Sequence, residues 1–161
     1  MKLKSRRFGE LNIPDEKVIT FPDGLLGFPE LKKFALLEHS DDTPLHWLVS
    51  IDEPELAFVV IEPTTFLGEY KVELTKLDVE KLELEEDTET AVLTIVVIPE
   101  DPREMTANTK GPLVINVEKM LGRQVVMDND EYSVKHKIFQ HVKDRNPKES
   151  TEEKVVVSVA L

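Results

Sequence analysis

The chain has 161 residues, the size of one domain, and 40% of them are hydrophobic, as in an ordinary globular protein. It contains no cysteine, which excludes disulfides, thiolate nucleophiles and zinc–sulfur sites. The net charge is −12, and residues 38–104 carry nineteen acidic side chains against four basic ones. Such a surface repels phosphate, so we expect no direct contact with nucleic acid. The excess favours a basic protein partner, although solubility alone is the simpler explanation of it.

Neither export nor membrane insertion is indicated. The N-terminal segment is basic but is not followed by an apolar run, and the apolar runs at 56–61 and 95–98 are far too short to cross a bilayer. We therefore expect a cytoplasmic protein that does not bind membranes.

The N-terminal half has mostly strand-type patterns. Residues 18–21 form a β-branched run that ends at the turn signal of Pro22, Asp23 and Gly24, where we expect Gly24 to adopt a positive φ. Pro29 is expected to open a short helical turn through Phe34. The segments 34–37, 45–51 and 56–61 follow, each bounded by polar residues, and predict three antiparallel strands in a meander.

The C-terminal half adds one or two helices. The spacing of apolar residues predicts a helix over 74–82 with Thr75 as its N-cap. Residues 91–98 form the strongest predicted strand, and 113–117 and 124–127 form a predicted hairpin turning at Gly122 and Arg123. A stripe of Val134, Ile138 and Val142 predicts a closing helix.

Eight to ten short strands predict an all-β, mainly antiparallel fold, curled into a small barrel or pseudobarrel with one or two short helices. We expect one domain over residues 1–145. Residues 146–161 form a C-terminal extension whose valine-rich end predicts either an extra strand or a mobile tail.

Residue types that can act in catalysis are present, but they do not occur at the spacings that catalytic motifs require. The six glycines form no phosphate-binding loop, and the four histidines have no metal-ligand spacing. The carboxylates are so numerous that their abundance is no sign of acid–base chemistry. The sequence thus predicts no catalytic residue, metal or cofactor, and a protein that works by binding. The alternative is a ligand carrier or enzyme that uses the mouth of the barrel.

The candidate binding residues lie in surface segments. Phe28 belongs to an apolar, glycine-bearing loop that either packs under the barrel or faces a partner, and Thr106 and Asn108 belong to a polar loop. The candidates in the acidic part of the chain are Glu53, Glu55, Glu83, Glu85 and Glu86.

Three motifs resemble a known family, the bacterial flagellar assembly factor FliW. They are F-x-D-G-[IL]-x-G-F at 21–28, the segment EPELAFVV at 53–60, and T-A-N-x-x-x-P-[LIV]-x-[IV]-N at 106–116. With GRQV at 122–125 and the segment 132–136, the resemblance extends from residue 3 to about 140.

This resemblance implies a noncatalytic pseudobarrel with two protein partners. They are cytoplasmic flagellin and the carbon storage regulator, a dimeric RNA-binding repressor of flagellin translation. The implied mechanism is partner exchange, in which the factor released by exported flagellin captures the repressor, away from its RNA-contacting surface, and translation resumes. The motifs assign no individual binding residue, because Gly, Pro and Asn in turns also serve the fold.

Overall fold

The computed structural model describes residues 1–38, 42–139 and 154–159. Within these ranges the chain forms thirteen strands and one complete α-helix, α1 (Lys76–Lys81). The strands are β1 (Lys2–Ser5), β2 (Gly9–Asn12), β3 (Val18–Thr20), β4 (Lys33–Glu38), β5 (His46–Ser50), β6 (Ala57–Ile61), β7 (Glu69–Leu74), β8 (Thr90–Val97), β9 (Thr106–Ala107), β10 (Leu113–Asn116), β11 (Leu121–Gln124), β12 (His136–Lys137) and β13 (Lys154–Val159). The predicted all-β class is confirmed.

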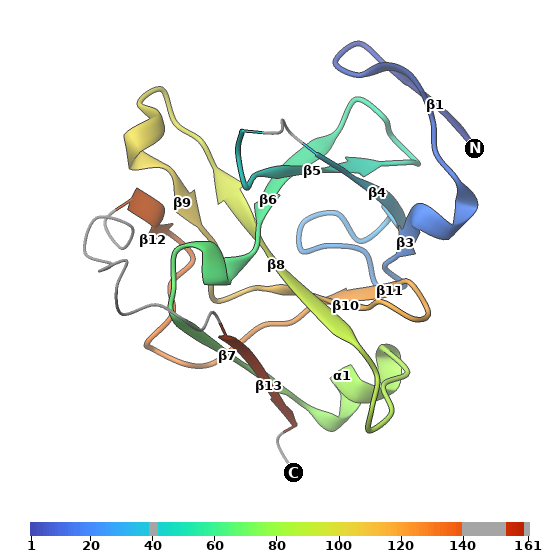
Figure 1. Cartoon of the computed structure of the whole chain (residues 1–161). Coiled ribbons are helices and arrows are strands. Elements are labelled where there is room, and N and C mark those ends of the chain that lie inside the picture. The colour runs from blue at the N-terminus through green and yellow to red at the C-terminus, as the bar shows by residue number, and fades with distance from the viewer. Residues whose placement is uncertain (39–41, 140–153, 160–161) are drawn as a thin grey trace.

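Seven strands close into the predicted barrel. Their order is β10-β11-β3-β4-β5-β6-β8, and β10 pairs back onto β8 to complete the ring (Figure 1). Every ladder of the ring is antiparallel except the one between β11 and β3, which is parallel and joins only Leu121 and Thr20. Short strands β9 and β12 extend the sheet beyond β8. The predicted meander corresponds to β4, β5 and β6.

Large apolar side chains fill the inside of the barrel. The rings of Phe21 and Phe34, both fully buried, meet edge to face with their centroids 5.4 Å apart. Leu48, Val60 and Leu113 from three further strands belong to the same cluster. A second cluster lies under β7 and α1, where the buried Tyr70 donates its hydroxyl hydrogen to the carbonyl of Thr109. Burial raises the pKa of Tyr70 above its ordinary value.

One predicted turn is wrong. Gly122 and Arg123 lie inside β11, and the hairpin turns instead at residues 117–120, where Met120 has a φ of +52°. Gly122 is needed for packing and not for turning, because a Cβ there would lie 2.5 Å from two ring carbons of Phe21.

The helix predictions are partly confirmed. α1 begins after Thr75, whose hydroxyl accepts from the Asp78 backbone N–H at 3.2 Å, so this N-cap is confirmed. The turn expected from Pro29 is limited to residues 29–30, because β4 begins at Lys33. In the C-terminal stripe, Val134 lies in a turn and Ile138 and Phe139 are helical, whereas Val142 lies outside the described residues.

Candidate functional site

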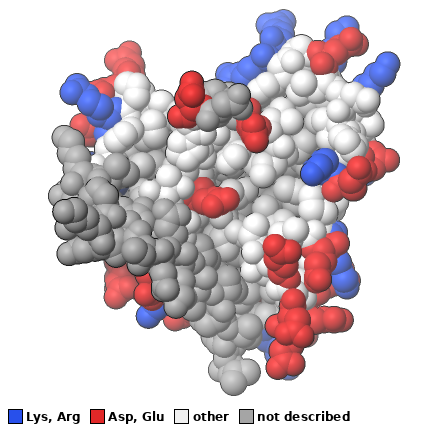
Figure 2. Space-filling model, viewed as in Figure 1, with Lys and Arg blue, Asp and Glu red and all other residues white. Residues whose placement is uncertain are grey.

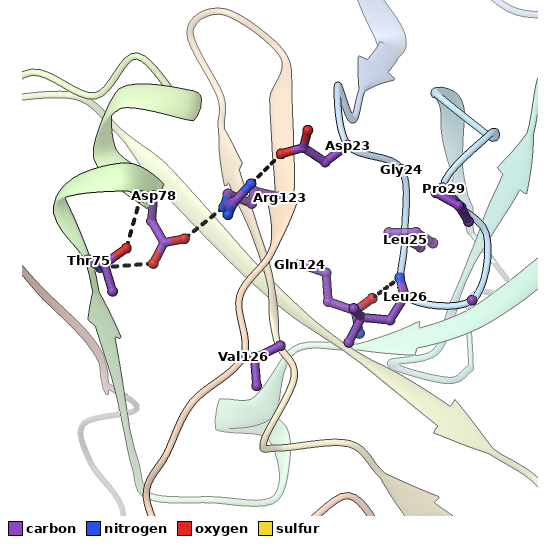
Figure 3. Close-up of a pocket in the computed structure, with 11 residues that line it drawn as sticks. Asp23, Gly24, Leu25, Leu26, Pro29, Thr75, Asp78, Arg123, Gln124 and Val126 are labelled. Carbon is purple, nitrogen blue, oxygen red and sulfur yellow. Dashed lines mark hydrogen bonds and ion pairs between the residues drawn. The ribbon is translucent and has the colours of Figure 1, made fainter.

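A surface pocket of about 550 Å³ lies where the glycine-bearing loop meets β11 and α1 (Figure 3). Its wall consists of residues 23–27 and Pro29 of the loop, Thr75 and Asp78 at the start of α1, and Arg123, Gln124 and Val126 along β11 and just beyond it. The pocket therefore brings together two of the segments that carry the family resemblance, although they are about one hundred residues apart in the chain.

The loop keeps its shape because Gly24 adopts the left-handed conformation predicted from the sequence. Its φ is +68°, and a Cβ at this position would lie 2.7 Å from the Cα of Pro29. The backbones of Leu25 and Phe28 then pair with each other, with the Phe28 N–H donating to the Leu25 carbonyl at 2.8 Å. The loop thus folds back tightly on itself.

The loop's apolar side chains divide between the core and the surface. Leu25 is buried, and the half-buried Phe28 packs its ring against Phe58 with the centroids 5.4 Å apart. Leu26, by contrast, is 60% exposed, and Val126 on the same pocket is 68% exposed. Of the loop's leucine and phenylalanine side chains, that of Leu26 is the exposed one, while the candidate Phe28 contributes mainly to packing.

Arg123 connects the three segments around the pocket. Its Nε donates to Oδ1 of Asp78 at 2.7 Å, and one of its terminal nitrogens donates to the carboxylate of Asp23. Lys81 of α1 lies 3.8 Å from Asp23 on the other side. Because the Asp78 side chain is 8% exposed and that of Arg123 is 20% exposed, the bond between them is shielded from solvent more than an ordinary surface ion pair.

Asp78 is also part of the cap of α1. The Thr75 backbone N–H donates to its Oδ2 at 2.8 Å, which together with the reverse bond forms a capping box. Burial disfavours the charged form, but the bonds from Thr75 and Arg123 outweigh that effect and hold the pKa of Asp78 below its ordinary value. Asp78 is therefore ionised at neutral pH and fixes the guanidinium.

Gln124 joins the pocket to the polar loop that contains the candidate Asn108. Its Oε1 accepts from the Leu26 N–H at 2.9 Å, and its Nε2 donates to the Gly111 carbonyl at 3.0 Å. Asn108 Oδ1 accepts from the N–H groups of Lys110 and Gly111 at 3.1 and 2.9 Å. The side-chain oxygen of Asn108 thus supports a turn. The candidate Thr106 is half-buried in β9.

The acidic candidates form two separate groups. Glu53 and Glu55 are exposed in the turn between β5 and β6, where the Glu55 carboxylate accepts from the Arg6 N–H at 2.9 Å. The other group, Glu83, Glu85 and Glu86, follows α1. The N-terminal hairpin that holds Arg6 and the helix α1 lie at opposite ends of the molecule in Figure 1. The structure therefore does not bring these two groups onto one patch.

The group after α1 borders a second hollow. Glu85 and Glu86 line a pocket of about 470 Å³ whose apolar wall includes Leu74, Val79 and Leu84. Glu83 forms an ion pair with Lys119 at 3.1 Å. Figure 2 shows carboxylates gathered over this part of the visible face. An apolar floor with an acidic rim suits a basic side chain with a long aliphatic stem.

The pocket's charged side chains are already engaged with one another. Asp23 and Asp78 both accept from Arg123, and the Thr75 hydroxyl accepts from a backbone N–H, so each polar group has a structural partner. In the described ranges there is no cluster of His, Asp and Glu that would hold a metal ion, and no helix is long and apolar enough to cross a bilayer. What the pocket leaves exposed is an apolar rim of Leu26 and Val126.

Sequence reasoning missed Leu26, Asp78, Arg123, Gln124 and Val126 as pocket residues. The available signal was that Asp23 and the GRQV segment both carry the family resemblance. No local spacing connects them, because the contacts between them depend on how the barrel closes.

The fold and the pocket define a closed seven-stranded barrel whose surface loop is bonded to β11. Comparison with known proteins identifies its family. Residues 2–138 match the model of the FliW protein family. The chain belongs to this family.

Relatives along most of the chain agree with this assignment. The flagellar assembly factor FliW of Natranaerobius thermophilus is 40% identical over 86% of this chain and 93% of its own length. The flagellar assembly factor FliW of Leptospira interrogans, serovar copenhageni, is 41% identical over 87% of this chain and 94% of its own. A crystal structure of the flagellar assembly factor FliW superimposes with a TM-score of 0.79 at 34% identity, over 86% of this chain and 97% of that one.

The Gly24→Val substitution is predicted to destabilise the protein by about 1–3 kcal/mol, because it combines backbone strain with a collision against Pro29. Urea unfolding monitored by circular dichroism measures this loss. Gly68→Val is the matched control, since Gly68 has no positive φ and a Cβ there would have no atom within 4 Å. Equal stability of Gly24→Val and the unaltered chain would contradict this view of the loop.

The Asp78→Asn substitution is predicted to lower the unfolding free energy at pH 7 by about 1–3 kcal/mol, because it weakens the bond to Arg123 and the cap of α1. The pKa of Asp78 is lower in the folded than in the unfolded chain. The stabilisation is therefore fully present above about pH 4–5 and is lost as the pH falls through the folded pKa, so the two proteins converge in acid.

Urea unfolding at a series of pH values from 7 to about 3 tests this convergence. Asp128→Asn, at an exposed position, is the control and is expected to change the unfolding free energy by no more than about 0.5 kcal/mol. A stability difference between Asp78→Asn and the unaltered chain that stays constant over the whole range would show that the charge of Asp78 is not responsible.

Proposed function

We propose that the protein is a noncatalytic cytoplasmic flagellar assembly factor that binds flagellin and the carbon storage regulator. While flagellin is abundant it occupies the protein, and the free regulator represses flagellin translation. Once flagellin has been exported, the protein captures the regulator and translation resumes. The protein therefore acts as a sensor of unexported flagellin through exchange of one partner for the other.

The observation that carries this proposal is the family match over residues 2–138, which includes the whole barrel. The compared relatives, which are named flagellar assembly factors, match along almost their entire length. Both facts support a role in flagellar assembly for the domain as a unit.

The packing of the barrel also favours a binding protein over a ligand carrier. Phe21, Phe34 and Leu48 are fully buried inside the barrel, where a carried ligand would have to lie. In the surface pocket, the carboxylates of Asp23 and Asp78 are held by Arg123 and are not placed to act on a substrate. Binding surfaces on the outside of the barrel require neither an internal cavity nor a free base.

We assign the regulator to the acidic part of the surface, because an RNA-binding protein presents basic residues. Glu85 and Glu86 lie on the rim of an apolar hollow. Glu53 and Glu55 form a second acidic group, in the turn between β5 and β6. Since the two groups are far apart, their effects on binding are separable by mutation.

Charge reversal is predicted to slow association with the regulator. Glu85 and Glu86, together with Glu83, are replaced by Lys in one variant, and Glu53 and Glu55 in another. We expect the association rate to fall by about tenfold at low salt and by less at physiological salt, because screening weakens electrostatic steering. Stopped-flow or surface plasmon resonance measures the rates.

Lysine reversals at exposed acidic residues outside the two groups are the controls for a general effect of net charge: Asp130 and Glu131 for the double variant, and Asp128, Asp130 and Glu131 for the triple variant. A variant that slows association more than its charge-matched control identifies the acidic group that faces the regulator. If neither variant differs from its control, electrostatic steering by these groups is excluded.

Partner exchange predicts that flagellin and the regulator weaken each other's binding. Linkage makes the effect reciprocal, and a coupling of about 1–3 kcal/mol corresponds to a loss of affinity of about 5- to 150-fold in both directions. Direct overlap would give complete exclusion. We favour overlap or near overlap, because a domain of this size has room for only about two interfaces of roughly 800 Å² per side before they crowd one another.

The experiment saturates the purified protein with flagellin, adds the regulator, and follows the complexes by native mass spectrometry. Release of flagellin as the regulator binds is the expected result. A ternary complex that forms with unchanged affinities would refute exchange while leaving the family assignment intact.

A further inference from the structure

Strand β7 lies outside the barrel and has a single strand neighbour among the described residues. That neighbour is β13, which runs parallel to it, and the two lie side by side below the barrel in Figure 1. The Lys71 N–H of β7 donates its hydrogen bond to a side chain and not to a strand, namely to the hydroxyl of Tyr132 at 2.9 Å. Among the described residues, β7 therefore pairs with a strand along one backbone edge, and β13 covers that edge.

The register between the two strands matches their sequence patterns. Along β7, the fully buried Tyr70, Val72 and Leu74 alternate with exposed charged residues. The register aligns these three buried positions with Val155, Val157 and Val159 of β13. A slip by one residue would align Lys154 or Ser158 with the buried positions instead, so the valine alternation specifies this pairing.

The two strands differ in their relation to the family. β7 lies within residues 2–138, which match the family model, whereas β13 begins only at Lys154. The edge thus belongs to the common fold, and the strand that covers it comes from outside the matched region. Pairing with this edge does not require β13 itself. It requires a segment with the same alternation of apolar residues.

We infer that the edge of β7 covered by β13 is an acceptor site for an extended protein segment, and that β13 occupies this site in the same molecule. The segment that fits is one with a β-branched apolar residue at every second position, entering parallel to β7. Backbone hydrogen bonds supply affinity in this mode of recognition, and the alternating side chains supply specificity. A partner segment must displace β13. Its apparent association constant is therefore the intrinsic constant multiplied by the fraction of molecules in which the edge is free.

The test uses a fluorescent peptide with the sequence of residues 153–161 and the full-length chain. In one variant, Val156→Pro/Val157→Pro, one of the two prolines removes a backbone donor to β7 whichever way the strand is phased, because successive N–H groups point to opposite edges. The matched control, Val156→Thr/Val157→Ile, keeps both N–H groups and both β-branched side chains.

We expect the peptide to bind the proline variant at least about ten times more tightly than it binds the unaltered chain or the control variant. Hydrogen exchange at Tyr70, Val72 and Leu74 is expected to be slow in the unaltered chain, at least about tenfold faster in the proline variant, and slow again when the peptide is added. A peptide with Pro at the position of Val156 is expected not to restore protection.

Equal binding of the peptide to all three proteins, or no binding to any of them, would overturn the inference. If the proline variant does not fold, the unaltered chain decides the matter alone. Slow exchange along β7 that a large excess of peptide leaves intact would support β13 as the occupant, and rapid exchange there would overturn it. None of these outcomes depends on flagellin or the regulator, so failure here leaves the proposed function untouched.

Discussion

The parallel seam between β3 and β11 is the contact on which the rest of the structure depends, because it closes the barrel. Its ladder joins only Thr20 and Leu121, which is too little backbone pairing to hold two strands together. The side chains that follow complete the closure. Gly122 lies against the ring of Phe21, and the next two residues of β11 bond to the loop that follows β3. Three consecutive residues of β11 thus fasten one segment about one hundred residues away.

This seam gives a structural role to several residues that carry the family resemblance. Gly24 shapes the loop, Gly122 admits the Phe21 ring, and Arg123 connects the loop to the helix α1 through Asp23 and Asp78. These residues serve the fold first, so they do not by themselves mark a binding surface. The outer rim of the seam is different, because Leu26 and Val126 are largely exposed there. A change at the seam is therefore expected to disturb partner binding through the loop's shape.

Local features of the fold followed from the sequence, whereas features that depend on closure did not. The strands of the meander, the N-cap of α1 and the positive φ of Gly24 each arise from neighbouring residues, and they were predicted correctly. Gly122 resembles a turn residue until Phe21 is placed beside it. β7 was missed because half of its residues are charged, and its alternating pattern becomes clear only with the buried cluster beneath it. The pocket was missed for the same reason, since its walls meet only in the closed barrel.

The most direct test of this account is a double-mutant cycle across the seam, with Gly122→Ala and Phe21→Leu measured by urea unfolding. Gly122→Ala alone should cost about 1–3 kcal/mol, because the new methyl group collides with the ring of Phe21. In the Phe21→Leu background the smaller side chain leaves room for that methyl group. The account therefore predicts that the double variant loses less stability than the two single variants together, by at least about 1 kcal/mol. Additive losses would show that Gly122 and Phe21 do not meet, and would contradict the seam as the contact that closes the barrel.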